Sequence, residues 1–240
     1  MTLDPIMCVH GDSREQIGYL PWGDLGDINA IITDPPYGVD FQSGFAATED
    51  GKKYTKKIAN DNDIDSALIL FRSIMASLFP HLASDAEVYV FTQWTVMEHF
   101  RQAINLIGDP FGVSVANLII WEKGWPGLGD LAGNWPNSFE MILYAKKGRR
   151  LIPSRDCSVI AIDRLPSSKM IHPTEKPVAL IRRLLEMSTN PGDLVIDPFA
   201  GSFSTADACK TLGRRCVAIE EDSDHFERGR RRVAAYDLFS

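Results

Sequence analysis

The sequence has few cysteines, and their spacing does not suggest a metal site or a disulfide framework. There are 4 cysteines in 240 residues, Cys8, Cys157, Cys209 and Cys216. None of them forms a C-x-x-C pair, the spacing on which zinc ribbons and redox motifs depend. Thiols without a pairing pattern are typical of a reducing compartment. We therefore expect a cytoplasmic protein that binds no metal.

Long apolar runs are also absent. No run approaches the ~20 residues that a helix needs to cross a bilayer, and the first ten residues lack the basic start and apolar stretch of a secretory signal. Hydrophobic residues make up 45% of the chain and charged residues 24%, as in ordinary soluble domains. The length is enough to bury a sizeable core. We expect residues 1–240 to form a single domain.

Positive charge is scarce overall but concentrated in one segment. The net charge is −7, which argues against long, non-specific wrapping of nucleic acid. Residues 146–169 carry seven bases and two acids, so this segment is +5 and the rest of the chain is −12. A solvated loop explains such a segment as well as a nucleic-acid contact does. The bases nearest its start are Lys146, Lys147, Arg149 and Arg150.

Residues 31–38 read Ile-Ile-Thr-Asp-Pro-Pro-Tyr-Gly, and we expect the function to centre on them. The β-branched residues predict a buried strand, which must end at the prolines because proline donates no hydrogen bond to a sheet. Gly38 lets the chain turn away. The segment therefore presents the Asp34 carboxylate, the Pro35 carbonyl and the Tyr37 ring at the carboxyl end of a strand. We call residues 34–37 the shelf.

The shelf suits the methylation of an exocyclic amino group on a nucleobase. Such an amine is a poor nucleophile because its lone pair is delocalised into the ring. Asp34 and Pro35 offer two acceptors for its N–H bonds, which favours a tetrahedral nitrogen with a free lone pair. Tyr37 offers a ring on which a base turned out of a duplex can stack. A plain strand that ends in a Pro-Pro turn is the alternative interpretation.

Strands and helices alternate along the chain, which predicts a mostly parallel sheet covered on both faces. Ser13 is a candidate helix cap, and 38–63 is predicted to be a long loop with four lysines. The predicted strands are 5–10, 30–33, 87–92, 117–121, 140–144, 194–196 and 215–219. The predicted helices include 64–82, 96–106, 177–188 and 222–236, with a further one that ends at Leu212.

A second informative stretch, residues 197–204, reads Asp-Pro-Phe-Ala-Gly-Ser-Phe-Ser. We call it the glycine turn. A strand that enters a turn of small residues before a helix brings backbone N–H groups and a positive helix end close to a ligand. Glu220 closes the next strand, and an acid at this distance typically binds ribose hydroxyls. An ordinary strand-to-helix turn is the alternative here.

Together these segments resemble the DNA methyltransferases that methylate amino groups with S-adenosylmethionine. The resemblance rests on Asp-Pro-Pro-Tyr at 34–37, on Asp-Pro-Phe-Ala-Gly-Ser at 197–202, and on His-Pro-Thr-Glu-Lys-Pro at 172–177. Residues 121–123 and 139–140 are similar to later strands of the family. With the catalytic motif first and the cofactor motif late, the order resembles the β group. It implies a circularly permuted, seven-stranded Rossmann-like α/β fold, in which the strands before Asp34 and Asp197 are neighbours.

The resemblance also implies roles for individual residues. The target base would be held by Asp34, Pro35, Pro36 and Tyr37. The cofactor S-adenosylmethionine would be bound by Asp12, Asp34, Thr174, Lys176, Asp197, Phe199, Gly201, Ser202 and Glu220, with Glu220 on the ribose and Thr174 and Lys176 on the methionine carboxylate. DNA would face the loops 38–63 and 146–172, through Lys52, Lys53, Lys56, Lys57, Lys146, Lys147, Arg149 and Arg150.

The chain departs from the family pattern in two places. Phe203 stands where the turn usually has a second glycine, so cofactor affinity or helix packing is expected to differ. No inserted recognition domain is present, since only 27 residues separate Tyr144 from His172. This predicts a short or loosely read DNA site, as in a phage or orphan bacterial enzyme rather than a stringent restriction-modification partner. A homodimer would add a second reading surface, but nothing in the sequence indicates one.

The sequence thus predicts a methyltransferase that acts on N6 of adenine in DNA after base flipping. N4 of cytosine is the alternative within the class, because the same acceptors serve both amines. An amino or amide nitrogen in RNA or protein is a more distant alternative. A non-catalytic nucleic-acid binder is a third, against which the intact Asp34 and Pro35 argue.

Overall fold

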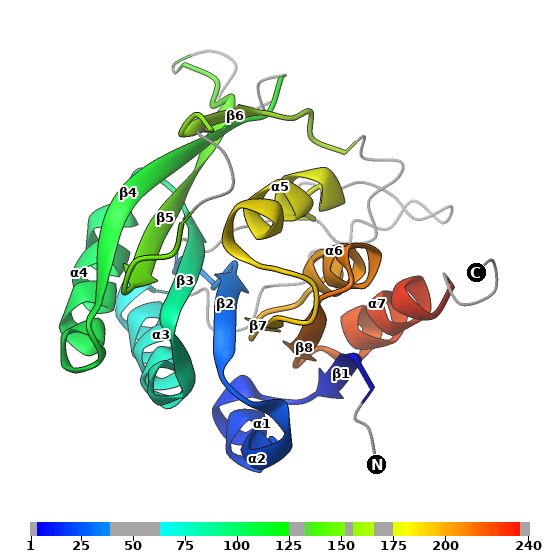
Figure 1. Cartoon of the computed structure of the whole chain (residues 1–240). Helices are drawn as coiled ribbons and strands as arrows, with labels where there is room; N and C mark the ends of the chain where they lie inside the picture. Colours follow the sequence, from blue (N-terminus) through cyan, green and yellow to red (C-terminus); the bar gives the residue numbers. More distant parts are fainter. Residues whose placement is uncertain are drawn as a thin grey trace.

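The predicted strands pair into one sheet with helices on both faces (Figure 1). The computed structural model describes residues 4–38, 63–124, 133, 135–151, 156–165 and 175–235. The strands are β1 (Ile6–His10), β2 (Ile28–Thr33), β3 (Leu82–Thr92), β4 (Val113–Glu122), β5 (Phe139–Lys147), β6 (Val159–Ala161), β7 (Leu194–Asp197) and β8 (Arg215–Glu220). The helices are α1 (Ser13–Tyr19), α2 (Trp22–Leu25), α3 (Ile64–Leu78), α4 (Met97–Gly108), α5 (Val178–Ser188), α6 (Ser204–Leu212) and α7 (Ser223–Ala235), with 3-10 turns η1 (Phe79–His81) and η2 (Asp109–Phe111).

The strands lie in the order β1-β8-β7-β2-β3-β5-β4-β6. Every neighbouring pair is parallel except the two pairs of β5, which runs antiparallel to β3 and β4. The mostly parallel sheet with one reversed strand agrees with the prediction. The strand number does not, because the described residues form eight strands and not seven. Since β5 is reversed, its first residues lie at the edge where the parallel strands end.

The additional strand is β6, inside the basic segment that we predicted to be a loop. It pairs in parallel with the last residues of β4. The amide of Ile120 donates to the carbonyl of Ser158 (2.7 Å), and that of Ile162 donates to the carbonyl of Glu122 (3.1 Å). A three-residue strand is too short to show a period in the sequence. The open edge of β4 decides its conformation.

Two helix ends also differ from the prediction. Helix α3 ends at Leu78, four residues early, because Pro80 cannot continue the helix and falls in η1 instead. At the start of α1, Ser13 is already helical, and the cap is Asp12, whose carboxylate accepts from the amide of Arg14 (2.8 Å). Both cases show local hydrogen bonding shifting an element by a few residues.

The helices divide between the two faces of the sheet, as Figure 1 shows. Side chains of α1, α3 and α4 form one apolar core with the sheet, and those of α5, α6 and α7 belong to a second core on the opposite face. Neighbouring residues of β2 enter different cores, Ile31 the first and Ile32 the second, as the two-residue period of a strand requires. No helix in the described ranges is long and apolar enough to span a bilayer.

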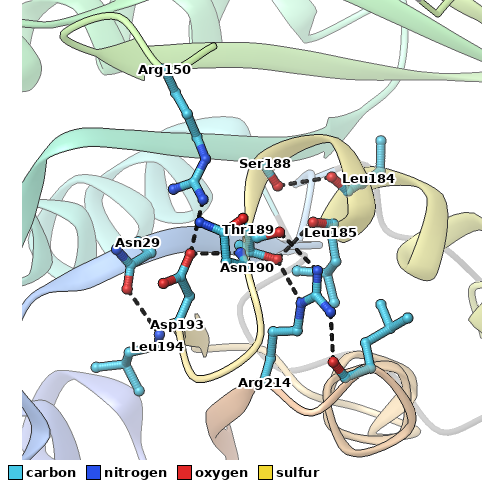
Figure 2. A network of polar contacts seen from close by, with 11 residues as sticks. Asn29, Arg150, Leu184, Leu185, Ser188, Thr189, Asn190, Asp193, Leu194 and Arg214 are labelled. Atoms are coloured by element: carbon cyan, nitrogen blue, oxygen red, sulfur yellow. Dashed lines mark hydrogen bonds and ion pairs between the residues drawn. The ribbon is translucent and has the colours of Figure 1, made fainter. Parts of the chain in front are cut away.

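A polar network joins the turns before β7 and β8 at the amino edge of the sheet (Figure 2). The buried Arg214 guanidinium donates to the carbonyl of Thr189 (2.7 Å), to its hydroxyl (3.1 Å) and to the carbonyl of Leu212 (2.5 Å). These charge-assisted bonds satisfy carbonyls at the ends of α5 and α6, where helix carbonyls lack partners. The network therefore ties the ends of the two helices to each other and to the start of β8.

The same edge sets the alignment of β2 and β7. The amide of Leu194 donates to the side-chain oxygen of Asn29 (2.9 Å), and the two strands then pair in parallel. Their carboxyl ends consequently leave the sheet side by side, although 163 positions separate Asp34 from Asp197. This confirms the expected adjacency of the two strands.

Phe203 turns its side chain away from the glycine turn and into the core. Its backbone is left-handed (φ 59°, ψ 29°), a conformation that glycine adopts without strain. The ring is fully buried, packs edge-on against Phe226 (5.9 Å between centroids) and lies over Gly229 of α7. A Cβ on Gly229 would collide with this ring. The Phe203 ring therefore takes part in the packing of α7 against the core, and its expected effect on cofactor affinity stays a prediction.

We predict that Phe203 and Gly229 are energetically coupled. Gly229→Ala should lower the free energy of unfolding by about 1–3 kcal/mol, because the added methyl overpacks the core. In the Phe203→Gly background the same substitution should cost less, since the ring is gone and residue 203 relaxes. Urea titration of the four forms measures the coupling. Gly18→Ala, at a helical glycine with open space around it, is the control and should not destabilise. Additive effects of the two substitutions would contradict the predicted packing.

Candidate active site

The candidate active site lies at the carboxyl edge of the sheet, where β2, β7 and β8 end. The shelf follows β2, and the glycine turn joins β7 to α6. Polar residues at the ends of adjacent parallel strands meet at one edge, which is where open α/β sheets bind ligands. The structure thus brings together the two segments that the sequence singled out.

The shelf is held in place by contacts of Tyr37 and of Gly38. The Tyr37 hydroxyl donates a short hydrogen bond to Asp34, and the Tyr37 ring meets the buried ring of Phe100 edge-on (6.4 Å). Gly38 has a positive φ of 70°, and a Cβ there would collide with the backbone of Asp63. The loop 38–63 therefore leaves and returns at the shelf, and only glycine fits at its first residue.

Lys176 connects the shelf to the middle of the sheet. Its ammonium lies 2.8 Å from Asp34 Oδ2 and 3.0 Å from Glu140 Oε2, with only 10% of its side chain exposed. It also lies over the Phe91 ring, 5.1 Å from the centroid. Burial opposes the charge, but the carboxylates of Asp34 and Glu140 outweigh it and raise the pKa of Lys176. The lysine therefore stays charged at any physiological pH.

Glu140 is a site residue whose role the sequence did not reveal. Its second oxygen lies 3.3 Å from the ammonium of Lys123, so one carboxylate joins two lysines. Burial alone would raise the pKa of Glu140, yet the two ammonium groups prevail and lower it. In the sequence, Glu140 is only the first residue of a predicted strand, with nothing to indicate its partner. Its position becomes informative once β5 is known to run antiparallel, which places Glu140 opposite Trp121 at the carboxyl edge.

The glycine turn is held by its own backbone and by Glu220. The amide of Gly201 donates to Glu220 Oε2 (2.7 Å), and that of Asp222 donates to Glu220 Oε1 (2.8 Å). The amide of Phe199 donates to Asp197 (3.1 Å). The Ser13 hydroxyl donates to the carbonyl of Pro198 (2.5 Å), so α1 supports the turn. Ser202 is buried at the start of α6.

The carboxyl groups of Asp34, Asp197 and Glu220 interact with one another beside the turn, and we call them the acidic cluster. Burial, followed by the negative charges of Asp34 and Glu220, raises the pKa of Asp197 to about 7, despite hydrogen bonds from Thr205 and Phe199. Burial also raises the pKa of Glu220. Because a positive charge would lower both pKa values, the acidic cluster suits a cationic ligand.

Asp12 follows β1 by two residues, and its carboxylate makes local contacts. Its carboxylate caps α1 and pairs with the Arg14 guanidinium at 2.5 Å. These bonds lower the pKa of Asp12, with the Arg14 side chain as the main cause. One face of the carboxylate is partly exposed, so its predicted contact with the cofactor stays a prediction.

The four bases at the start of the basic segment lie away from the site. They follow or end β5, whose carboxyl end is at the amino edge of the sheet because the strand is reversed. Lys147 donates to the carbonyl of Leu82 (2.9 Å), and Arg150 pairs with Asp193 (3.0 Å; Figure 2). Lys146 and Arg149 flank them. The structure therefore separates these four bases from the shelf, and their expected contact with DNA stays a prediction.

Some predicted site residues lie outside the described ranges. These are Thr174 and the loop lysines Lys52, Lys53, Lys56 and Lys57. Their roles stay predictions. The described ends of both segments, Gly38 with Asp63 and Glu175 with Lys176, lie at the candidate site.

Comparison with known proteins agrees with this geometry. The model of a DNA methylase family, N6_N4_Mtase, matches residues 28–230. The methylase YubD of Escherichia coli (strain K12) is 29% identical over 208 residues, which cover 87% of this chain and 82% of YubD. The DNA adenine methyltransferase YhdJ of the same organism is 48% identical over 69 residues, 29% of this chain and 24% of YhdJ. The crystal structure of an M1.HpyAVI–SAM complex superposes with a TM-score of 0.72 at 24% identity, covering 95% of this chain and 98% of that one. Since the family match spans both the shelf and the glycine turn, the chain belongs to the N6_N4_Mtase family of DNA methylases.

Proposed function

We propose that this DNA methylase transfers a methyl group from S-adenosylmethionine to N6 of adenine in DNA. The observation that carries the proposal is the shelf beside the glycine turn, which puts two candidate acceptors for an amine next to the acidic cluster. The YhdJ match supports adenine as the target. The catalytic motif precedes the cofactor motif in the chain, which supports the circularly permuted order of the β group.

The residues of the acidic cluster and the glycine turn fit S-adenosylmethionine. When bound, this cofactor supplies a methyl group on a positively charged sulfur. The methionine part of the cofactor would be lined by Asp197, Phe199, Gly201 and Ser202. The acidic cluster nearby suits its positive charge. Glu220 would accept from the ribose, because two backbone amides leave further lone pairs on its oxygens. Asp12 would meet the adenine, and Thr174 with Lys176 the methionine carboxylate. The relative M1.HpyAVI was solved as a SAM complex.

The shelf would hold the flipped base and direct its lone pair. Asp34 accepts one N–H and the Pro35 carbonyl the other, while Pro36 keeps the backbone rigid. Tyr37 orients Asp34 through its hydroxyl. The Lys176 ammonium, 2.8 Å from Asp34 Oδ2, helps to hold this carboxylate in place as an acceptor during transfer. No covalent bond between protein and base is needed.

N4 of cytosine is the second candidate, because the matched family covers both amines and the same two acceptors serve either. Digestion of methylated DNA to nucleosides separates the candidates. The proposal expects N6-methyladenine. N4-methylcytosine would select the alternative, and modification of RNA or a protein amide in place of DNA would move the substrate class.

Asp34 should be essential for transfer but not for binding the cofactor. We expect Asp34→Ala to lower methylation by more than ~100-fold, as for the loss of one preorganised polar group. Lys176 keeps Glu140 as a partner in this variant, so the fold should persist. Methylation rates and calorimetry with S-adenosylmethionine make the test, with Asp65→Ala, an exposed acid in the first turn of α3, as control. Near-normal turnover by Asp34→Ala would rule out the mechanism.

Cofactor affinity should depend on the ionisation of Asp197. With a pKa of about 7, this carboxyl is largely protonated below neutral pH, whereas a cationic ligand favours its ionised form. The affinity should therefore fall as the pH drops below 7, by up to about tenfold per pH unit. Calorimetry between pH 8 and pH 6 measures this. Asp197→Asn should flatten the profile, and a flat profile in the wild type would exclude Asp197 from the cofactor site.

We further propose that the loop 38–63 contacts DNA phosphates, because both of its ends lie at the shelf. Replacing Lys52, Lys53, Lys56 and Lys57 by alanine should flatten the dependence of log K on log salt by roughly 0.9 for each lost phosphate contact. Alanine at Lys146 and Arg149, at the amino edge, is the control and should leave the slope unchanged. The opposite pattern would place DNA at the amino edge.

A further inference from the structure

Helix α7 contacts the candidate site through a partly buried side chain, that of Arg232. Its Nη1 lies 2.6 Å from Glu175 Oε1, and its Nε lies 2.9 Å from Asp207 Oδ2. Nη1 also donates to the carbonyl of Ser202 (3.4 Å). One guanidinium thus contacts α6, the glycine turn and the segment that carries Lys176.

The two segments that Arg232 joins are also tied to each other. The Ser204 hydroxyl donates to the carbonyl of Lys176 (2.8 Å) and lies 3.0 Å from the Ser202 hydroxyl. The ammonium of Lys176 then reaches Asp34 and Glu140. A continuous set of polar contacts therefore runs from α7 to the shelf.

We propose that Arg232 is a positioning residue, which holds Lys176 and the glycine turn in the arrangement that binds the cofactor. The inference rests on the proposed function. Arg232 contacts Glu175 and the carbonyl of Ser202, so it would influence the cofactor site through these two residues. Cofactor affinity, more than the chemical step, should depend on it.

The two ion pairs of Arg232 fix the positions of Glu175 and Asp207, but burying these charges costs stability. Glu175 and Asp207 have only 2% and 4% of their side chains exposed. Among the described residues, Asp207 Oδ1 is buried and finds no hydrogen-bond partner, which costs stability. Burial also opposes the charge of Arg232, although its two carboxylates raise its pKa. Apolar residues would fill such a site at least as favourably, but they would not fix the direction of the Ser202 carbonyl or of Glu175.

The test compares Arg232→Gln with Arg231→Gln, the exposed neighbour on the same helix. We expect Arg232→Gln to raise the dissociation constant of S-adenosylmethionine by at least ~10-fold, while kcat at saturating cofactor changes less than ~3-fold. In the ligand-free protein, amide hydrogen exchange should speed up at residues 175–178 and 201–204. Arg231→Gln should change neither. Wild-type affinity and exchange in a folded Arg232→Gln protein would overturn the proposal.

Two further measurements separate the possible failures. Arg232→Gln could unfold because buried charges are left unpaired. In that case cofactor binding is measured on a neutral triple variant, Glu175→Gln, Asp207→Asn, Arg232→Met. Weakened cofactor binding by this folded variant supports positioning, and wild-type binding shows that the ion pairs serve stability alone. If the wild-type protein itself binds no S-adenosylmethionine, the proposed function fails, and the exchange data on the ligand-free protein still test the role of Arg232.

Discussion

A single buried ammonium group, that of Lys176, joins the shelf to the rest of the sheet. Two carboxylates from different strands, Asp34 and Glu140, hold it, and neither would be stable at this depth without a cation. The oxygens of Asp34 are thus held in place by the Lys176 ammonium and the Tyr37 hydroxyl. In the proposed reaction, a carboxylate held in this way needs no reorganisation when an amine binds.

The contacts at the opposite edge make this arrangement possible. Arg214 and Asn29 fix the turns from which β7 and β8 start, and strand pairing carries that alignment across the sheet to the carboxyl edge. Site geometry therefore depends on polar groups far from the site. The glycine turn accommodates Phe203 for a separate, local reason. The Phe203 ring extends into the core beside Gly229, and the Phe203 backbone keeps the left-handed conformation that the turn needs.

The sequence predicted those features that depend on local chemistry. The proline-ended strand, the glycine turn and the acid that ends β8 are visible as short patterns because each residue constrains its own backbone. The contacts of Glu140 and Arg232 were not predicted, because they depend on strand direction and on helix packing between residues far apart in the sequence. Strand β6 was not predicted because its conformation depends on pairing with the edge of β4.

The basic segment shows most clearly why charge counted along a sequence differs from charge on a surface. Its first four bases looked suited to DNA, yet the reversal of β5 carries them to the amino edge, where Lys147 and Arg150 bind a backbone carbonyl and Asp193. Charges that satisfy internal acceptors contribute little to attracting phosphates. On a chain of net charge −7, attraction of DNA to the shelf must therefore come from cations at the carboxyl edge. There Lys123 and Lys176 are largely neutralised by Glu140 and Asp34. This supports the proposal that the lysines of the loop 38–63 attract DNA, which would couple DNA binding to the residues proposed to hold the target base.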